Sequence, residues 1–130
     1  MYFIEGQSHD PAFNLALEEY LYRSVDEGHP GYFLLWQNAP SIIVGRFQNT
    51  AQEVNRPFVE ERGIHVVRRI SGGGAVYHDL GNVNYSFIVP NDEGTPFDFA
   101  RHARPVIDAL AKLGVEAESG GRNDLLIDGR

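Results

Sequence analysis

The sequence has 130 residues, with 11 Lys and Arg against 18 Asp and Glu, and this length suits one domain with a real core. The formal net charge of −7 argues against a nucleic-acid partner, because binding to a duplex depends on cationic side chains that neutralise phosphates. No cysteine, signal-peptide pattern or apolar run of membrane-spanning length occurs, so we expect a cytoplasmic chain without disulfides, thiolate metal sites, a cysteine nucleophile or a membrane partner.

The first expected elements are a short strand and an amphipathic helix. Residues 2–4 are apolar and predict a strand, and Asp10 followed by Pro11 is typical of a helix start. The helix is expected over residues 11–24. Its apolar residues recur at helical spacing, so we expect them, aromatic side chains included, to face the core: Phe13, Ala16, Leu17, Tyr20 and Leu21.

Two apolar strands follow the helix. Residues 32–36 and 41–47 are rich in β-branched and aromatic side chains, with the turn residues 37–40 between them. Because both runs are almost wholly apolar, we expect a sheet that is covered on both faces. Arg46 interrupts this pattern near the end of the second run, which makes it a candidate pocket residue.

A turn and a short helix are expected next. The spacing of Thr50 and Glu53 fits a capping box, but Pro57 lies inside the helix that would follow. We therefore expect a brief turn, and then a helix over residues 57–62 that ends at Gly63.

The C-terminal part begins with a polar loop. A helix is expected over residues 98–113, with Pro105 as a kink or as its true start. Strands at 115–118 and 124–127 follow, and Asp128–Gly129 is a strong hairpin signal. The sequence ends before a partner strand, so we expect that the chain is the N-terminal piece of a longer polypeptide.

The most informative stretch spans residues 64–89. Arg68 and Arg69 end an apolar run, three glycines at 72–74 follow, and a second β-patterned run leads out. Glycines allow backbone N–H groups to approach a ligand, and guanidinium groups match phosphate or carboxylate oxygens. The pattern opens no helix, so it is neither a Walker loop nor a dinucleotide fingerprint. A plain hairpin or bulge is the alternative, but polar neighbours such as His78 favour a ligand loop.

Four segments together resemble the lipoate–protein ligase family of the biotin/lipoate ligase superfamily. They are residues 10–19 (DPAFNLALEE), 45–49 (GRFQN), 68–82 (RRISGGGAVYHDLGN) and 121–125 (GRNDL), of which the third is the most specific. The resemblance implies an α+β fold like the catalytic domains of class II aminoacyl-tRNA synthetases and biotin ligases. In that fold a mixed, largely antiparallel sheet is flanked by helices, and here it would be truncated at the C-terminus.

The resemblance also implies a two-step reaction. Lipoate and ATP, with Mg²⁺, would give lipoyl-adenylate and pyrophosphate. The lipoyl group would then pass to a lysine of a lipoyl carrier domain, such as those of the 2-oxoacid dehydrogenases or the glycine cleavage H-protein.

Specific residues match the family's functional positions. Arg69 and Asp124 are the implied catalytic residues, with Asp124 as a possible Mg²⁺ ligand. The implied ATP-binding residues are Arg69, Gly74, Ala75, Val76, Tyr77 and Asn123. The implied lipoate-binding residues are Trp36, Val44, Arg46, Ser71, Gly73 and His78.

The chain departs from the family in one important respect. Family members carry a catalytic lysine in the strand after Asp128–Gly129, whereas the only lysine here is Lys112, which does not match. We therefore expect residues 1–130 to be the N-terminal portion of the catalytic domain, without the remainder of that domain and the C-terminal domain. By itself this fragment is expected to have little or no ligase activity.

Two other functions remain open at this point. A cofactor-independent octanoyl- or lipoyltransferase shares the fold and a similar arginine–glycine segment, but it transfers the acyl group through a cysteine, which would have to lie beyond Arg130. A non-catalytic module that binds lipoate or a nucleotide is the other alternative.

Overall fold

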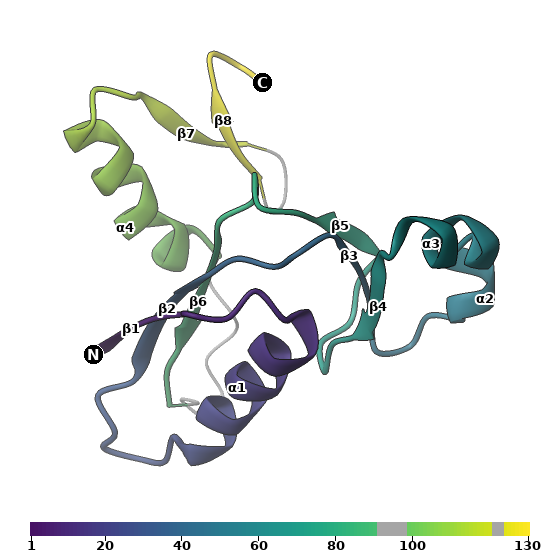
Figure 1. Ribbon diagram of the computed structural model, residues 1–130. Helices are drawn as coiled ribbons and strands as arrows, with labels where there is room; N and C mark the ends of the chain where they lie inside the picture. Colours follow the sequence, from purple (N-terminus) through teal and green to yellow (C-terminus); the bar gives the residue numbers. More distant parts are fainter. Residues whose placement is uncertain (91–98, 121–123) are drawn as a thin grey trace. The chain divides into compact units, whose positions relative to one another are not determined.

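The computed structural model describes residues 1–90, 99–120 and 124–130. The chain divides into two compact units, residues 1–91 and 92–130, and each is described by itself (Figure 1). The first unit contains β1 (Tyr2–Glu5), α1 (Pro11–Ser24), β2 (Tyr32–Trp36), β3 (Ser41–Val44), α2 (Thr50–Glu53), α3 (Arg56–Arg62), β4 (His65–Arg68), β5 (Val76–His78) and β6 (Asn84–Ile88). The second contains α4 (Phe99–Lys112), β7 (Ala117–Gly120) and β8 (Asp124–Ile127).

The strands of the first unit form two three-stranded sheets. In one, β2 lies between β1, which is parallel to it, and β6, which is antiparallel. In the other, β3 lies between the parallel β4 and the antiparallel β5. The two expected apolar strands are present, although the second ends at Val44, before the predicted residue 47. Strands β2 and β3 follow one another but belong to different sheets, so residues 37–40 connect two sheets.

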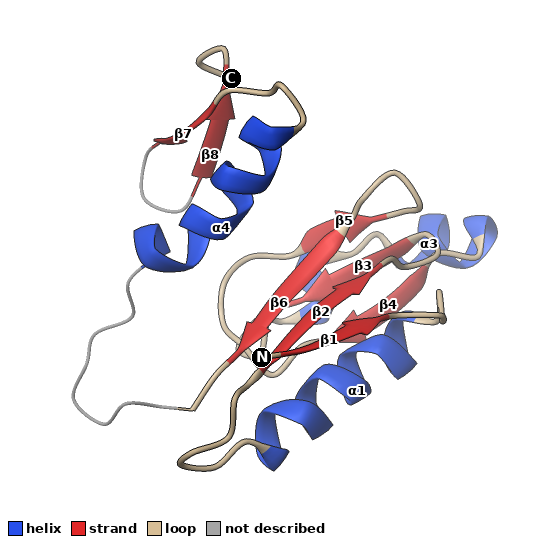
Figure 2. Cartoon of the chain, turned by 90° about the vertical axis from the view of Figure 1, so that its left-hand side faces the viewer, coloured by secondary structure: helices blue, strands red, loops and turns tan. Residues whose placement is uncertain are grey.

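Helix α1 begins and ends as predicted, because its local signals are strong. Asp10 is the N-cap, and its Oδ1 accepts hydrogen bonds from the backbone N–H groups of Ala12 at 2.8 Å and Phe13 at 3.3 Å. Pro11 takes the first helical position, where its missing N–H is no loss. The helix lies against one face of the β1-β2-β6 sheet (Figure 2).

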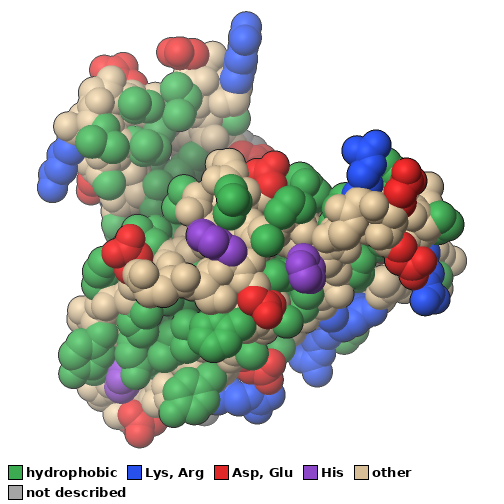
Figure 3. All heavy atoms as spheres, viewed as in Figure 1, with side chains coloured by type: hydrophobic (Ala, Val, Ile, Leu, Met, Phe, Trp, Pro, Cys, Tyr) green, Lys and Arg blue, Asp and Glu red, His purple; other side chains and the backbone are tan. Residues whose placement is uncertain are grey.

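The predicted buried face of α1 is wrong in part. Phe13 and Tyr20 are 55% and 69% exposed, and hydrophobic side chains reach the surface over α1 (Figure 3). Asn14 is instead buried at 1% exposure. It turns inward because its side chain has hydrogen-bond partners there, which apolar periodicity does not reveal. Leu21 is buried as expected, in a cluster with Leu34, Trp36 and Ile88.

The segment between β3 and β4, two neighbouring strands of one sheet, differs slightly from expectation. Residues 50–53 form the one-turn helix α2, where a turn was predicted, and Asn49 is its N-cap. The following helix α3 ends as predicted at Gly63, which has a φ of +62°. A left-handed residue at this position is favourable only for glycine, because it has no Cβ.

In the second unit, α4 continues through Pro105, so this proline is not the start of the helix. Strands β7 and β8 form an antiparallel hairpin, and β7 begins two residues after the predicted strand. The predicted turn at Asp128–Gly129 is confirmed: both residues have positive φ, 53° and 73°, and Ile127 and Arg130 exchange two backbone hydrogen bonds. Among the described strands, parallel and antiparallel pairings both occur, as the α+β prediction requires.

Within the described residues, no helix has the combination of length and apolarity that crossing a bilayer requires.

Candidate functional site

The glycine-rich segment crosses over the end of β3. It leaves β4 on one side of β3 and enters β5 on the other, so it is not the plain hairpin that the sequence left open. The backbone N–H of Arg46 donates to the carbonyl oxygen of Ser71 at 2.9 Å, which joins the segment to the residues after β3. Gly73 has a φ of +93°, a conformation that side chains disfavour. We refer to residues 69–75 as the glycine loop.

Arg69 holds the glycine loop in place. Its Nη2 donates to the carbonyl oxygens of Gly72 at 2.7 Å and Gly74 at 2.8 Å, and its Nη1 donates to that of Ile43 in β3 at 3.0 Å. A guanidinium has five N–H donors, so these three bonds leave about two for another acceptor. The side chain therefore organises the loop and also presents positive charge there.

Arg68 has a different role from its neighbour. Its Nη1 lies within hydrogen-bond distance of the carbonyl oxygens of Gly45, Arg46 and Gln48, at 2.7, 3.1 and 2.9 Å. Its Nη2 donates to Oγ1 of Thr50 at 2.7 Å. The two adjacent arginines thus fasten two different loops. The sequence proposed either one as an anion ligand, but of the two only Arg69 lines the pocket described next.

A pocket of about 330 Å³ lies between the two sheets of the first unit and α1. Its wall includes the apolar side chains of Trp36 and Ile43, which are almost fully buried. The complete lining is Leu15, Glu18, Trp36, Ile43, Arg69, Ser71, Val76, His78, Val83, Asn84, Tyr85 and Ser86. Apolar and polar side chains share this lining, which suits a small organic ligand that has both an apolar and a polar part.

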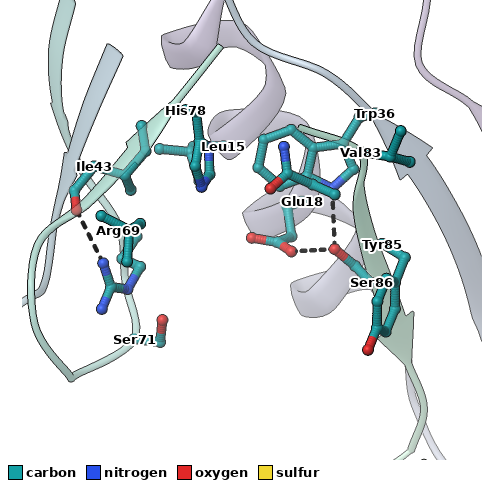
Figure 4. A pocket seen from close by; sticks show the side chains of 12 residues that line it. Leu15, Glu18, Trp36, Ile43, Arg69, Ser71, His78, Val83, Tyr85 and Ser86 are labelled. Carbon is teal, nitrogen blue, oxygen red and sulfur yellow. Dashed lines mark hydrogen bonds between the residues drawn. The ribbon is translucent and has the colours of Figure 1, made fainter. Parts of the chain in front are cut away.

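The two sides of the pocket differ in charge. Figure 4 shows Arg69 and Ser71 on one side and Glu18 with Ser86 on the other. On the second side, Oγ of Ser86 donates to a carboxylate oxygen of Glu18 and accepts from the indole Nε1 of Trp36 at 3.1 Å. An anionic head group would be stabilised on the arginine side and repelled by the glutamate side.

His78 lies between these two sides, where its ring and that of Trp36 are in an edge-to-face arrangement with centroids 6.1 Å apart. Its Nδ1 is 3.1 Å from Nδ2 of Asn38. Burial, and secondarily the positive charge of Arg69, lower the pKa of His78 below its ordinary value of 6.5. The ring therefore favours its neutral form.

Five of the residues expected from the resemblance line this one pocket: Trp36, Arg69, Ser71, Val76 and His78. Three others do not line it: Val44 follows Ile43 in β3, the exposed Arg46 donates its backbone N–H to Ser71, and Gly73 lies in the glycine loop. Gly74 and Ala75 also belong to the glycine loop, and Tyr77 lies in β5 with 51% of its surface exposed.

The remaining two expected residues belong to the second unit. Asn123 is outside the described residues, and Asp124 is an exposed residue at the start of β8. The described residues contain no group of three or more His, Cys, Asp or Glu side chains that could hold a metal ion. Mg²⁺ commonly uses one or two carboxylates together with substrate phosphates, so a role for Asp124 stays a prediction.

Sequence reasoning missed the polar side of the pocket. The core face predicted for this helix comprised apolar residues alone and so did not include Glu18, although Asn14 and Glu18 are four residues apart and share one helix face. To predict their inward position from the sequence, two polar residues would have to be assigned to the buried face of the helix. Ser86 and Asn38 had no such signal, because Ser is ordinary in an alternating strand and Asn is ordinary in a turn.

A sequence model described as the lipoyl protein ligase A/B catalytic domain matches residues 10–130, which is nearly the whole chain. The chain belongs to this family. The match includes every segment that carried the resemblance, and the predicted family is therefore confirmed.

Two curated members of the ligase family are similar to the chain over most of its length. It is 54% identical over 131 residues to the lipoate-protein ligase LplJ of Bacillus subtilis, with 100% of the chain and 39% of that protein covered. It is 50% identical over 118 residues to lipoate–protein ligase 1 of Staphylococcus aureus, with 91% and 36% covered. The chain thus spans somewhat less than two fifths of the length of these relatives.

Solved structures of the family share the fold. The P. falciparum protein LipL1 in complex with lipoate matches with a TM-score of 0.86 at 31% identity, covering 98% of the chain and 40% of that protein. The bipartite lipoate protein ligase of Thermoplasma acidophilum, described with its E2 lipoyl domain, matches with 0.84 at 32%, covering 98% and 51%. A lipoate-protein ligase A bound with ATP matches with 0.79 at 33%, covering 95% and 50%. These matches confirm the predicted fold class.

Proposed function

We propose that the protein to which this chain belongs activates lipoate with ATP and transfers the lipoyl group to a lysine of a lipoyl carrier domain. The observation that carries the proposal is the pocket of about 330 Å³, which has apolar side chains such as Trp36 and Ile43 in its wall and the guanidinium of Arg69 on one side. A small acid with an apolar tail needs both features. The two relatives are lipoate–protein ligases, and the solved neighbours include one with lipoate and one with ATP, which supports these two substrates.

The first step joins two anions, so it needs positive charge and alignment. A carboxylate oxygen of lipoate attacks the α-phosphorus of ATP, and the bond from that phosphorus to pyrophosphate breaks. Arg69 supplies charge for the phosphoryl oxygens, while Gly74, Ala75, Val76 and Tyr77 contact the nucleotide beside it. The hydrogen bonds of Arg69 to the glycine loop support this role, because they hold the loop at the pocket that receives the acid.

The pocket holds the acid with its apolar tail between Trp36 and Ile43. Ser71 and His78 contribute polar contacts to the bound acid. Val44, Arg46 and Gly73 shape the surroundings of this pocket, and the contact of the Arg46 backbone with Ser71 supports their inclusion.

In the second step, the ε-amine of the carrier lysine attacks the acyl carbonyl, AMP leaves, and an amide forms. The likeness to an archaeal ligase described with its E2 lipoyl domain supports a lipoyl domain as acceptor. We include the glycine cleavage H-protein among the proteins that accept the lipoyl group. Asn123 and Asp124 lie close to the phosphates in this proposal, with Asp124 as the Mg²⁺ ligand, and a lysine beyond Arg130 completes the site. A cytoplasmic location fits these acceptors.

Lipoate-dependent exchange of labelled pyrophosphate into ATP tests the proposal on the full-length protein. Exchange that requires lipoate is the expected result, because only a reversible adenylation step links these reagents. Residues 1–130 alone should show little or no exchange, since the proposal assigns the catalytic lysine to a position outside them. Mass spectrometry of a carrier domain should show a lipoyl adduct only when ATP is present.

The same experiment distinguishes the transferase, since the family description covers both the A and B branches. Absence of exchange, together with transfer from an octanoyl or lipoyl carrier protein without ATP, would assign the protein to a cysteine-dependent transferase. Lipoate binding without either activity would leave a binding module.

A further inference from the structure

The proton position on His78 follows from a buried chain of amides behind it. Asn38 is fully buried, Asn14 is 1% exposed, and neither belongs to the pocket lining. Asn14 Nδ2 lies 2.9 Å from Oδ1 of Asn38, and Asn38 Nδ2 lies 3.1 Å from Nδ1 of His78. Among the described residues, none forms a hydrogen bond with the other ring nitrogen, Nε2, of this pocket-lining histidine.

The orientation of both amides is determined by the backbone. The terminal atom of Asn14 lies 2.9 Å from the carbonyl oxygens of both Ser8 and Gln37, which can only accept, so this atom is the nitrogen. It therefore faces the oxygen of Asn38, because a reversed Asn38 would place two NH₂ groups against each other. Consequently, Asn38 presents an N–H donor to His78.

A donor opposite Nδ1 requires that Nδ1 be unprotonated. The neutral ring then carries its proton on Nε2, and an imidazolium would place two N–H groups against each other. The charged or titratable groups that share the pocket with His78 are Arg69 after β4, Glu18 on α1 and Tyr85 on β6. Burial and Arg69 lower the pKa of His78, which acts in the same direction as the amide chain.

We propose that Asn38, backed by Asn14, is a positioning residue that holds His78 as a neutral Nε2–H donor to an acceptor atom of the bound acid. The substrate part of this inference rests on the proposed function. Asn38 acts only through His78, since it does not reach the pocket. The arrangement also keeps a second positive charge out of a pocket that already contains Arg69.

Nitrogen NMR of the full-length protein tests the proton position without any ligand. Histidine-selective ¹⁵N labelling distinguishes a protonated ring nitrogen from a bare one, and the signal lost in His78→Gln assigns the ring. We expect protonated Nε2 and bare Nδ1 across neutral pH. A proton on Nδ1 of the wild-type protein would overturn the inference, whatever the protein binds.

Asn38→Asp replaces the N–H donor opposite Nδ1 with a hydrogen-bond acceptor, because a carboxylate accepts hydrogen bonds. The variant therefore favours a proton on Nδ1. At pH 8 the ring should carry its proton on Nδ1 and lose the donor to the acid, so lipoate affinity by calorimetry should fall about tenfold. At pH 6 the ring becomes an imidazolium beside the carboxylate, which restores the Nε2 proton and the affinity. Lipoate stays ionised throughout this range. The variant should therefore bind lipoate more tightly at pH 6 than at pH 8.

Asn55→Asp is the matched control, since Asn55 is an exposed N-cap of α3 and aspartate caps equally well. In this control variant, the ratio of the lipoate affinities at pH 6 and pH 8 should equal the ratio in the wild type. If Asn38→Asp does not fold, Asn38→Ala replaces it and should allow protonation of Nδ1. An affinity of Asn38→Asp that changes with pH as in the wild type would overturn the inference. An Nε2 proton without lipoate binding at any pH would support the proton position but overturn both the donor's assignment to this acid and the proposed function.

Discussion

Gly45 and Gly73 contact each other through their backbones: a Cβ placed on Gly45 would lie 2.1 Å from the carbonyl oxygen of Gly73 and 3.3 Å from Nη2 of Arg69. The residue after β3 and the glycine loop therefore fit together only if position 45 lacks a side chain. This close approach determines where the loop lies over the pocket, and it leads to the first prediction.

Gly45→Ala should lower the free energy of unfolding by about 1–3 kcal/mol, because the loop must move to admit the methyl group. Gly72→Ala is the control in the same loop, since a Cβ there meets nothing within 4 Å. Its effect should stay within about 0.5 kcal/mol. Denaturant unfolding of the full-length protein measures both, and equal effects would show that the close approach has no energetic role.

The two adjacent arginines should differ in function. Arg69→Lys keeps the charge but not the geometry that reaches Ile43 and the glycine loop, so lipoate affinity should fall about tenfold or more. Arg68→Lys releases the segment after β3 and should lower stability by about 1 kcal/mol, with lipoate affinity within about twofold of the wild type. Calorimetry measures the change in lipoate affinity, and denaturant unfolding measures the change in stability. Equal losses of affinity would contradict this division.

The lowered pKa of His78 predicts the sign of a stability effect. Above the ordinary pKa of 6.5, folded and unfolded chains both hold the neutral ring, so there is no penalty. As the pH falls below 6.5, the unfolded chain binds a proton that the folded chain binds only at lower pH, and the folded state loses stability. The stability of the wild type relative to His78→Gln should therefore fall between pH 7.5 and 5.5. A relative gain over that range would mean that the pKa is raised.

Ser86 should stabilise the polar side of the pocket. In Ser86→Ala, the indole N–H of Trp36 loses its acceptor and Glu18 loses its donor, in a place where Trp36 is only 6% exposed. The expected loss is about 1–3 kcal/mol in the free energy of unfolding. Ser119→Ala, at an exposed position of β7, should change stability by less than about 0.5 kcal/mol. If both variants unfold alike, the hydrogen bonds of Ser86 make no net contribution.

Local chemistry made several elements predictable. The cap at Asp10, the left-handed end at Gly63 and the Asp128–Gly129 turn each depend on residues within four positions, so their signals are complete in the sequence. The buried face of α1 was less predictable. Asn14 and Glu18 point inward toward Asn38 and Ser86, which are more than 20 residues away, and the sequence alone does not distinguish such inward polar residues from outward ones.

The candidate site, too, was predictable from the sequence only in part. The arginines and glycines of residues 68–74 marked a functional loop, and a family resemblance assigned roles to its neighbours. Neither the motif nor the resemblance could show that Arg68 fastens another loop while Arg69 lines the pocket. The different hydrogen-bond partners of these adjacent side chains become evident only once β4 pairs with β3.

The sequence by itself determined the family, both ends of α1 and the C-terminal end of α3, since these depend on sequence motifs, spacing and local capping. Only the tertiary structure decided that β2 and β3 belong to different sheets, and that a buried pair of asparagines stands behind His78. Such features arise from hydrogen bonds between distant segments, and those bonds exist only after the chain has brought its donors and acceptors together.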